Sequence, residues 1–418
     1  MRVIQCRVCQ SQRLDRVLDL GRTALANRFL RPEQITEPEL TFPLRLVLCG
    51  ECGLVQLDEE VPREILFKDY LYVSGTSNLV RSHARWLGEY LGRRYGLDDQ
   101  DLVMEAASND GTVLKEFRWQ GMPVLGIEPA ENIAASAIER GIPTVVDFFD
   151  ERLAHRLRDQ YGPARLFLAR HVLAHVADLQ GFVRGMKHVL ANDGVGIIEV
   201  PHAAELFRHL EFDTIYHEHL CYFSAAVLQT LLRQFGLSII DVDRVPIHGG
   251  SLLVHVAHEG ANAVSPRLVE VLSQEENLQL DQIETWRSFA RRVAHVKEEL
   301  LRFLDVIRAR EESLIGFGAA AKANTLLAYC GIGRERLPYI VDRSPLKQGL
   351  LTPGHHIPVR GPDMLMEQPP DVILILAWNF AAEIVEQQSE HRRRGGRFAV
   401  PLPAPRFLSE QAWSKASA

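Results

Sequence analysis

The chain contains 418 residues, which is too long for a single hydrophobic core and predicts two to four domains. Its 46% apolar and 24% charged residues are typical of soluble globular proteins, and its net charge of −7 argues against a nucleic-acid partner. No apolar stretch approaches the ~18 residues of a membrane span, and the start MRVIQCRVCQ lacks an apolar signal core, so we expect a cytoplasmic protein.

The first predicted element is a small metal-binding module over residues 1–65. Two Cys-x-x-Cys motifs, Cys6 to Cys9 and Cys49 to Cys52, have the spacing of zinc knuckles. In a reducing compartment such pairs are more often metal ligands than disulfides. Four thiolates fill a tetrahedral site, so we predict a structural Zn²⁺ with no open position for catalysis. The alternative, a pair of redox motifs, lacks a thioredoxin-like strand before either pair.

The next predicted domain covers residues 66–260 and alternates strands with helices. A helix is predicted over 82–96. The predicted strands cover 102–108, 124–130, 143–149, 165–173 and 193–201, with a closing strand over 251–258. Strands that alternate with helical segments predict an α/β fold, in which a doubly wound parallel sheet is covered by helices on both faces.

Residues 261–310 are predicted to form a helical linker, and residues 311–418 a second, smaller Rossmann-like domain. In the linker, apolar residues recur at near-helical spacing, which we interpret as core packing. The residues of this stripe are Trp286, Phe289, Val293, Val296, Leu300 and Leu304. Beyond it, the run LIGFG leads into a helical segment, and the runs PYIVDRS and DVILILAWNF add two more strands.

Polar residues at three successive strand ends predict a nucleotide-like ligand. A small-residue turn that enters a helix cradles a ligand, and an acid at the second strand end accepts hydrogen bonds from ribose hydroxyls. This order fits S-adenosylmethionine better than NAD, because no glycine triplet is placed for a pyrophosphate. The predicted cofactor-binding residues are Glu105, Ser108, Asn109, Asp110 and Gly111, then Glu128, and then Asp147 and Phe148 for the adenine.

The run Tyr216-His217-Glu218-His219 places four proton-transferring side chains in a row. Each polar group buried without a partner costs roughly 1–3 kcal/mol, so the run predicts a proton-transfer site, with a self-bonded polar loop as the alternative. A His-Glu-x-x-His zinc site is excluded, because Cys221 occupies the place of the second histidine. The two-residue spacing predicts an extended segment in which His217 and His219 face one way and Tyr216 and Glu218 the other.

Taken together, these motifs resemble the bacterial sugar-nucleotide C-methyltransferases. The resemblance spans the chain from Cys6 to about Phe380 and rests on EAASNDG, GIEPAENIA, DFF, VLAHVADL, YHEHLCYFS, HGGSL, GFGAAAKANTLL and LAWNF in this order. It implies a zinc-binding domain, a class I methyltransferase domain and a C-terminal Rossmann-like domain that helps to hold a nucleotide-linked sugar. It also implies S-adenosylmethionine-dependent methylation next to a ketone, commonly at C3 of a dTDP-4-keto-6-deoxy sugar, in branched deoxysugar biosynthesis.

The resemblance also implies catalytic roles. His219 maps to the base, and a neutral imidazole with a pKa near ~6.5 suits the removal of a proton next to a ketone. Glu218 would orient this ring, and a hydrogen-bond donor near the enolate oxygen would contribute about 2.7–4 kcal/mol. The implied catalytic residues are His219, Glu218, Tyr216, His175 and Tyr72, with Tyr70 as the alternative to Tyr72.

The chain departs from the family pattern in several places. Arg170 and His171 stand where asparagines are expected, and Ala107 stands where a methyltransferase usually has glycine. Ala323 replaces a glycine after the C-terminal lysine, and Leu253 replaces an arginine after HGGSL. The departures around His171 leave the identity of the sugar open.

The C-terminal run GFGAAA resembles a dinucleotide fingerprint, with Asp342 ending the next strand. Alone it would predict an NAD-dependent oxidoreductase acting on a sugar nucleotide, which is the alternative function. Lys322 and Asn324 at the helix start suit a diphosphate equally well, so we prefer nucleotide-sugar binding. The predicted substrate-binding residues are His248, Gly249, Gly250, Ser251, Gly318, Lys322, Asn324 and Asn379.

Two further interpretations stay open, namely a zinc-containing methyltransferase of RNA or protein and a non-catalytic scaffold that binds nucleotide sugars. The acidic balance and the second nucleotide-like fold count against the first of these. The sequence leaves the oligomeric state open and is compatible with a monomer.

Overall fold

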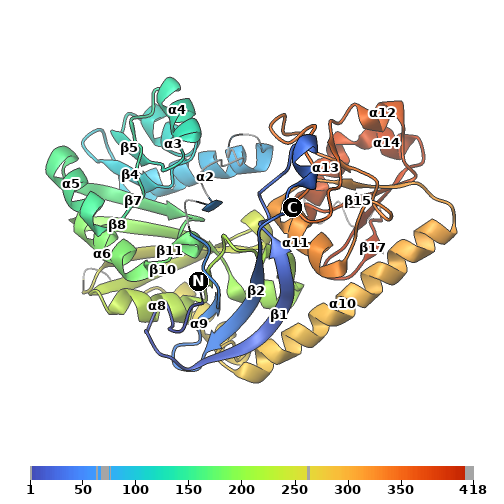
Figure 1. Ribbon diagram of the computed structural model, residues 1–418. Coiled ribbons are helices and arrows are strands. Elements are labelled where there is room, and N and C mark those ends of the chain that lie inside the picture. Colours follow the sequence, from blue (N-terminus) through green and yellow to red (C-terminus); the bar gives the residue numbers. More distant parts are fainter. Residues whose placement is uncertain (1, 63–64, 67–74, 76, 261–263, 410–418) are drawn as a thin grey trace. The chain divides into compact units, whose positions relative to one another are not determined.

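The computed structural model describes residues 2–62, 65–66, 75, 77–260 and 264–409 (Figure 1). The chain folds into two compact units. The first contains Met1–Arg16, Val47–Glu205 and Glu218–Thr285, and the second contains Val17–Leu46, Leu206–His217 and Trp286–Ala418. The four domain ranges expected from the sequence stay predictions.

A four-stranded sheet has the order β1-β2-β3-β9. Its strands are β1 (Leu14–Ala24), β2 (Thr41–Cys49), β3 (Val55–Leu57) and β9 (Cys221–Tyr222), with the 3₁₀ helix η1 (Pro32–Thr36) after the first strand. β3 and β9 are antiparallel, and the Leu57 N–H donates to the Leu220 carbonyl over 2.9 Å. This pairing holds the chain directly after His219 against the strand that follows the second cysteine pair.

The first unit contains a seven-stranded sheet with the order β10-β11-β8-β7-β4-β5-β6. Its strands are β4 (Val103–Ala106), β5 (Val124–Ile127), β6 (Thr144–Val145), β7 (Ala164–Arg170), β8 (Leu190–Pro201), β10 (Leu237–Val245) and β11 (Ser251–His258). The strands from β8 to β6 are parallel, and β10 and β11 add an antiparallel edge. The predicted α/β fold with a parallel sheet is confirmed, whereas β10 lies where no strand was predicted.

Helices alternate with these strands. They are α2 (Asn78–Tyr95), α3 (Leu114–Trp119), α4 (Glu131–Glu139), α5 (Glu151–Tyr161), α6 (Leu179–Val189), α7 (Ala203–His209), α8 (Ala225–Arg233) and α9 (Pro266–Asn277). Ser77, Asp150, Asp178, Ser224 and Ser265 each accept a hydrogen bond from a first-turn N–H, which fixes where α2, α5, α6, α8 and α9 begin. The short 3₁₀ helices η3 (Leu173–His175) and η5 (Ile247–Gly249) follow β7 and β10.

The core of this unit includes buried apolar side chains from two helices and two strands. Leu87 and Leu91 of α2, Phe117 of α3, Leu166 of β7 and Ile197 of β8 belong to one buried cluster. Each such side chain contributes about 1.5–3 kcal/mol when it is fully buried. The packed helices and sheet leave the polar carboxyl ends of the parallel strands as the edge at which α/β proteins bind ligands.

The second unit contains a long helix, α10 (Ile283–Ala309), and a six-stranded sheet with the order β14-β13-β12-β15-β16-β17. The predicted apolar stripe of α10, from Trp286 to Leu304, is buried. The strands are β12 (Leu314–Phe317), β13 (Ile340–Val341), β14 (Val359–Arg360), β15 (Val372–Ile375), β16 (Arg397–Val400) and β17 (Arg406–Phe407). All but β17 are parallel, as the predicted Rossmann-like pattern requires.

Shorter elements complete the second unit. They are η4 (Phe212–Thr214), α11 (Ala321–Cys330), α12 (Met364–Glu367), η6 (Trp378–Phe380), α13 (Ala381–Gln387) and α14 (Ser389–Arg393). Residues 17–46 belong to this unit, where Leu30 forms a β-bridge with Leu351 and the Asn324 amide donates to the Ala26 carbonyl over 2.6 Å. Among the described residues, no helix is both long and apolar enough to cross a membrane.

Candidate active site

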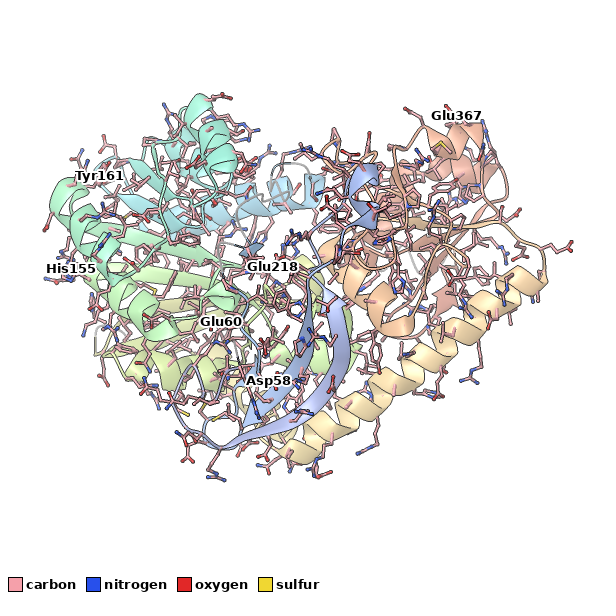
Figure 2. The ribbon with its side chains drawn as sticks, viewed as in Figure 1. Asp58, Glu60, His155, Tyr161, Glu218 and Glu367 are labelled. Atoms are coloured by element: carbon pink, nitrogen blue, oxygen red, sulfur yellow. The ribbon has the colours of Figure 1, made fainter. Side chains whose placement is uncertain are left out.

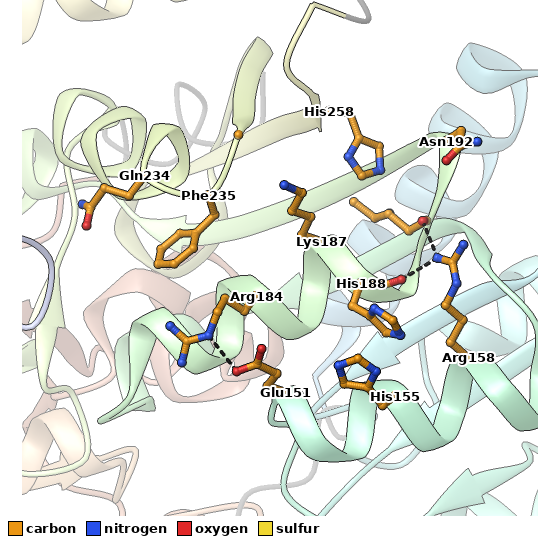
Figure 3. A pocket seen from close by; sticks show the side chains of 12 residues that line it. Glu151, His155, Arg158, Arg184, Lys187, His188, Asn192, Gln234, Phe235 and His258 are labelled. Atoms are coloured by element: carbon orange, nitrogen blue, oxygen red, sulfur yellow. Dashed lines mark hydrogen bonds and ion pairs between the residues drawn. The ribbon is translucent and has the colours of Figure 1, made fainter.

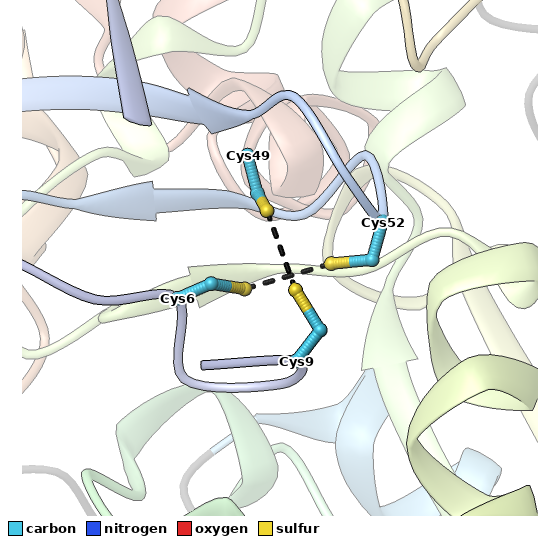
Figure 4. Close-up of side chains that lie close together, drawn as sticks. All are labelled: Cys6, Cys9, Cys49 and Cys52. Atoms are coloured by element: carbon cyan, nitrogen blue, oxygen red, sulfur yellow. Dashed lines mark hydrogen bonds between the residues drawn. The ribbon is translucent and has the colours of Figure 1, made fainter. Parts of the chain in front are cut away.

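The four paired cysteines meet at one point (Figure 4). The Cys6 and Cys52 sulfurs are 3.5 Å apart, as are those of Cys9 and Cys49, and all four lie within 4.8 Å of one another. Tetrahedral zinc with Zn–S bonds of about 2.3 Å requires sulfurs about 3.8 Å apart, so the cluster fits this ion. The hydrogen bond between Cys6 and Cys52 lowers the pKa of Cys6 to about 5 and raises the pKa of Cys52, so it favours one thiolate in this pair.

The turn after β4 has a left-handed backbone. Ala107, Asn109 and Gly111 have φ angles of 53°, 51° and 73°, a region that favours glycine. Ala107 therefore adopts, at an energetic cost, the conformation for which methyltransferases usually have glycine. A Cβ on Gly111 would lie 2.8 Å from Cγ1 of Ile142, so this position excludes any other residue without a shift of Ile142.

Glu128 and Asp110 hold this turn in place. The Glu128 carboxylate accepts the N–H groups of Asn109 and Ala130, each over 2.9 Å, and burial raises its pKa. Asp110 accepts the Thr112 hydroxyl and the Arg140 guanidinium, each over 2.6 Å. Both carboxylates thus have a structural role in addition to the ligand role predicted for them.

Glu105 and Ser108 fit a bound ligand better. Both are buried, and within the described part of the chain neither Glu105 Oε2 nor Ser108 Oγ has a hydrogen-bond partner. Burial raises the pKa of Glu105 to about 7, although Arg170 lies 3.3 Å away and opposes the shift. Buried polar atoms without partners are costly, and the amino and carboxylate groups of a methionine tail would satisfy them.

The residues predicted to contact the adenine, Asp147 and Phe148, are half-buried. Asp147 is paired with Arg156 over 2.8 Å and accepts the backbone N–H of Phe148 over 2.9 Å. Phe149 packs against the buried rings of Phe167 and Phe182, at 4.8 and 5.1 Å between centroids. Phe149 therefore packs against the core, and both Phe148 and Phe149 are half-buried.

His175 and His219, two of the predicted catalytic residues, lie close together. Their rings are 4.9 Å apart at an angle of 70°, and the Leu220 N–H donates to the Ala174 carbonyl over 2.7 Å. Burial, followed by the charge of His171, lowers the pKa of His175 to about 4. The His175 ring is therefore neutral near physiological pH. Glu218, which precedes His219 in the chain, is buried (Figure 2).

The predicted extended conformation of residues 216–219 is wrong. His217 and Glu218 lie in a turn and are buried, whereas Tyr216 and His219 are half-buried. The His217 Nε2 atom lies 3.2 Å from the Pro43 carbonyl, inside the second unit. Because the chain turns here, exposure follows a three-residue spacing instead of the two-residue alternation of a strand. Tyr72 and Tyr70 lie outside the described residues.

The HGGS motif forms a tight turn before β11. His248, Gly249 and Gly250 have φ angles of 54°, 96° and 123°, and a Cβ on Gly250 would lie 2.9 Å from Cγ of Glu205. The Ser251 hydroxyl donates to the Ile247 carbonyl over 3.0 Å, which closes the turn. The glycines and Ser251 thus shape the loop, and His248 is the residue of the motif whose side chain carries an aromatic ring.

Gly318 and Asp342, two residues of the C-terminal fingerprint region, have structural roles. A Cβ on Gly318 would lie 2.6 Å from the Ala377 Cβ, so only glycine fits there without movement. The Asp342 carboxylate, which would bind a ribose in a dinucleotide site, accepts the N–H groups of Ala319 and Ser344, each over 2.8 Å. The Asn324 amide is similarly engaged with Ala26.

Lys322 lies in a buried polar cluster of the second unit. Its Nζ sits 4.0 Å above the Trp378 ring, and the Trp378 indole N–H donates to Asp213 over 2.7 Å. Burial lowers the pKa of Lys322 and raises that of Asp213, each opposed by the other's charge. Within the described part of the chain, Lys322 Nζ and Asn379 Oδ1 are buried without hydrogen-bond partners, which leaves both able to bind a polar ligand.

A cavity of about 820 Å³ on the first unit contains none of the predicted site residues (Figure 3). Arg184 in its wall is paired with Glu151 over 2.6 Å, and Arg158 donates to the Leu190 carbonyl just after α6. Cations at a helix C-terminus are stabilised by the helix dipole, which accounts for this basic group. Leu190 begins β8, so the cavity lies at the edge of the sheet opposite the carboxyl strand ends.

Sequence reasoning missed one residue that the structure places among the candidate site residues. Glu199 in β8 is fully buried, and its carboxylate lies 2.7 Å from the His171 ring and 2.6 Å from the His83 ring. Its signal in the sequence is a single acid inside the apolar run VGIIEVP. Such an acid is costly to bury without charged partners, so it marks either a structural ion pair or a site.

Comparison with known proteins gives matches over most of the chain. Three family models match, describing a zinc binding domain over residues 6–67, a methyltransferase domain over residues 81–242 and a C-methyltransferase C-terminal domain over residues 246–403. The C-methyltransferase NovU of Streptomyces niveus is 36% identical over 409 residues, which cover 98% of this chain and 97% of NovU.

Solved structures match less closely. The PH0226 protein from Pyrococcus horikoshii OT3 gives a TM-score of 0.35 at 15% identity, over 45% of this chain and 95% of that chain. An S-adenosylmethionine-dependent methyltransferase from Clostridium acetobutylicum ATCC 824 gives 0.34 at 12% identity, over 42% and 92%.

Proposed function

This chain belongs to the C-methyltransferase family, and we propose that it methylates a nucleotide-linked 4-keto-6-deoxy sugar at C3, the carbon next to the ketone. Membership of this family makes the chain an S-adenosylmethionine-dependent C-methyltransferase. The sugar substrate and the methylated carbon are what we propose. The observation that carries the proposal is the pairing of the His175 and His219 rings at 4.9 Å, directly after β7 and beside β9. Two imidazoles in contact suit a reaction that begins with removal of a proton from carbon.

The methyl donor fits the turn after β4. Glu105 and Ser108 would bind the methionine tail of S-adenosylmethionine, since both hold buried polar atoms without partners in the described chain. Glu128 would add a contact to the ribose, and Asp147 and Phe148 contacts to the adenine. When bound, the donor supplies a methyl group on a sulfonium centre, which is electrophilic enough to react with an enolate.

His219 acts as the base in this proposal. The proton next to the ketone moves to its imidazole, and negative charge develops on the keto oxygen of the sugar. A neutral His175 ring and the Tyr216 hydroxyl are the groups that would stabilise this oxygen, and one such donor contributes about 2.7–4 kcal/mol. Glu218 would hold the His219 ring in the tautomer that accepts the proton.

The nucleotide part of the substrate is assigned to the second unit. Lys322, Asn324 and Asn379 are the predicted substrate residues there that hold a buried polar atom without a hydrogen-bond partner in the described chain, and a diphosphate would bind the lysine. His248 and the turn formed by Gly249, Gly250 and Ser251 would contact the sugar. Gly318 would shape the approach to Lys322, and Asn324 would act by fixing the start of α11.

The cysteine cluster is assigned one zinc ion with a structural role. Cys6, Cys9, Cys49 and Cys52 supply four sulfurs at a spacing that suits tetrahedral coordination, and four protein ligands leave no position for a reacting water. The Leu57–Leu220 hydrogen bond joins this module to the chain after His219. The ion would thereby stabilise the region around the base without taking part in the chemistry.

The test of this function is a substrate panel. The protein is incubated with methyl-labelled S-adenosylmethionine and with dTDP-, GDP- and CDP-linked 4-keto-6-deoxy sugars, and the products are analysed by mass and by NMR. We expect one methyl group on carbon with one of these sugars, and exchange of the C3 hydrogen with deuterated solvent. Methylation on oxygen or nitrogen, or no exchange under turnover conditions, would rule the proposal out.

The first variant to test is His219→Asn. Loss of the base should lower kcat by roughly 10²–10⁴-fold, while S-adenosylmethionine still binds with wild-type affinity by calorimetry. His258→Asn is the matched control, because this histidine lines the cavity at the opposite edge of the sheet and should keep wild-type turnover. A His219→Asn enzyme with near-normal kcat would remove His219 as the base.

A further inference from the structure

Arg170 lies between two buried carboxylates of the first unit. Its guanidinium is 3.3 Å from Oε1 of Glu105 and 3.4 Å from Oε1 of Glu199. The side chain of Arg170 is 11% exposed, and those of the two acids are 3% and 0% exposed. These ion pairs are therefore shielded from water and are stronger than pairs on the surface.

The sheet fixes the place of Arg170. It is the last residue of β7 and pairs with Glu199 of the neighbouring strand β8. On the other side of β7, Glu105 of β4 pairs with Leu168. Leu168 is two positions before Arg170, so both side chains lie on the same face of the sheet. Strand register alone thus brings the guanidinium to both acids.

The two acids depend on Arg170 to different degrees. Glu199 has a closer partner, because its Oε2 lies 2.6 Å from Nε2 of His83. In Glu105, Oε1 accepts from Arg170, whereas Oε2 has no hydrogen-bond partner among the described residues. A buried carboxylate is costly unless it is paired, so the contact with Arg170 matters most to Glu105.

Arg170 also favours the ionised form of Glu105. Burial raises the pKa of Glu105 to about 7, the charge and hydrogen bond of Arg170 oppose this rise, and the charges of Glu199 and Asp110 add to it. Without the guanidinium this pKa would be higher, and Glu105 would be largely protonated near neutral pH. A carboxylate binds an ammonium group more strongly than a neutral carboxyl group does.

We propose that Arg170 is a positioning residue of the methyl-donor site, which holds Glu105 through Oε1 so that Oε2 binds the ammonium group of the methionine tail. This role rests on the proposed function, in which Glu105 binds that tail. It also gives a physical role to an arginine at a position where the family pattern leads us to expect asparagine.

The test compares two ligands that differ in the tail. S-adenosylhomocysteine, the demethylated donor, keeps the ammonium group, and 5′-methylthioadenosine lacks the whole tail. Both are titrated calorimetrically into the full-length protein at pH 7.5. Arg170→Gln should weaken binding of S-adenosylhomocysteine by about 5–30-fold and change the affinity for 5′-methylthioadenosine by less than about 2-fold. No sugar is present, so the result is independent of the proposed sugar substrate.

Two further variants serve as controls. Arg170→Lys keeps a positive charge beside Glu105 and should lose clearly less affinity for S-adenosylhomocysteine than Arg170→Gln does. Arg165→Gln removes an arginine near the start of the same strand, where it pairs with Asp193 over 3.3 Å. This second variant should bind both ligands with wild-type affinity.

Three results would overturn the role of Arg170. They are an Arg170→Gln variant that binds S-adenosylhomocysteine like the wild type, one that loses affinity equally for both ligands, and an Arg170→Lys variant as weak as Arg170→Gln. Equal losses would indicate a general structural effect, since only one of the two ligands carries the ammonium group.

Glu105→Gln separates this role from the assignment of the donor site. If Glu105 binds the tail, this variant should lose about 10–100-fold in affinity for S-adenosylhomocysteine alone. Wild-type affinity for both ligands would contradict the assignment of Glu105, and the role of Arg170 would fail with it. A selective loss in Glu105→Gln without one in Arg170→Gln would overturn the role of Arg170 alone.

Discussion

His175 shows how burial prepares a side chain for proton transfer. His175 is half-buried with its ring beside the His219 ring, and its pKa falls to about 4, mainly because partial removal from water disfavours the imidazolium. A histidine in water is half protonated near pH ~6.5, so a ring with a lower pKa is neutral over the whole physiological range. The same shift makes the stability of the folded chain depend on pH.

The folded state should lose stability through His175 as the pH falls from 6.5 to 4. In this window the unfolded chain binds a proton at His175 and the folded chain does not, so acid favours unfolding. The full contribution is about 3 kcal/mol, and His175→Asn should abolish it. The check is the free energy of unfolding in urea at pH 7.5, 5.5 and 4.5 for both proteins. A wild-type-minus-variant difference that stays constant with pH would contradict it.

The residues of the site were predictable to different degrees. The four cysteines follow from the spacing of their motifs, whereas His175 and His219 were implied by the family resemblance, and the structure brings the members of each set close together. The extended conformation of residues 216–219 was wrong, because a two-residue alternation holds only in a strand and this run forms a turn. Glu199 was missed because its partners come from distant segments, and no local pattern indicates them.

Among the elements, the turn after β4 is tightly constrained. Gly111 has a φ angle of 73°, and its missing Cβ leaves the space that Ile142 fills. Gly96, at the end of α2, has a φ angle of 59°, and a Cβ there would meet nothing within 4 Å. The two glycines thus share the backbone conformation and differ in packing.

Gly111→Ala should therefore destabilise the chain by about 2–4 kcal/mol, from backbone strain and overpacking together, and weaken binding of S-adenosylmethionine. Gly96→Ala should cost only the strain, about 1 kcal/mol, and leave that binding unchanged. Both are measured by urea unfolding and by calorimetric titration with the methyl donor. Equal effects of the two substitutions would show that packing against Ile142 contributes nothing.

The cysteine module should depend on its metal. We expect about one zinc per chain by atomic spectroscopy, and a Tm lower by roughly 10 °C in Cys49→Ser or after chelation. Cys330→Ala is the control, because this cysteine is buried in the second unit, whereas the cluster belongs to the first. A metal-free protein that melts with the wild type would refute a structural zinc.

At the scale of helices and strands, the sequence predicted most elements correctly. The parallel strands β4, β5, β7 and β8 and the helix α2 all lie where apolar runs and helical periodicity placed them. Strand β10 was missed because it pairs with β11 at an edge, where pairing with a neighbour matters more than local pattern. The assignment of residues 17–46 to the second unit depends on contacts about 300 positions away, which periodicity cannot indicate.

For the whole molecule, the choice between two cofactors is the decisive test. A methyltransferase should be stabilised by S-adenosylmethionine, by about 2.7 kcal/mol at a concentration of 100 times Kd. The same concentration of NAD⁺ should leave the melting temperature unchanged, because Asp342 is already engaged by Ala319 and Ser344. Stabilisation by NAD⁺ and none by S-adenosylmethionine would favour the oxidoreductase alternative.

The placement of residues 17–46 has a consequence for synthesis on the ribosome. The Ala26 carbonyl and the Glu39 carboxylate find their partners, Asn324 and His356, 298 and 317 positions later in the chain. At about 5–20 residues per second, these partners emerge about 15–60 s after the early segment. The nascent polypeptide must carry residues 17–46 without these final neighbours for that time, so chaperone capture early in translation should concentrate on this segment.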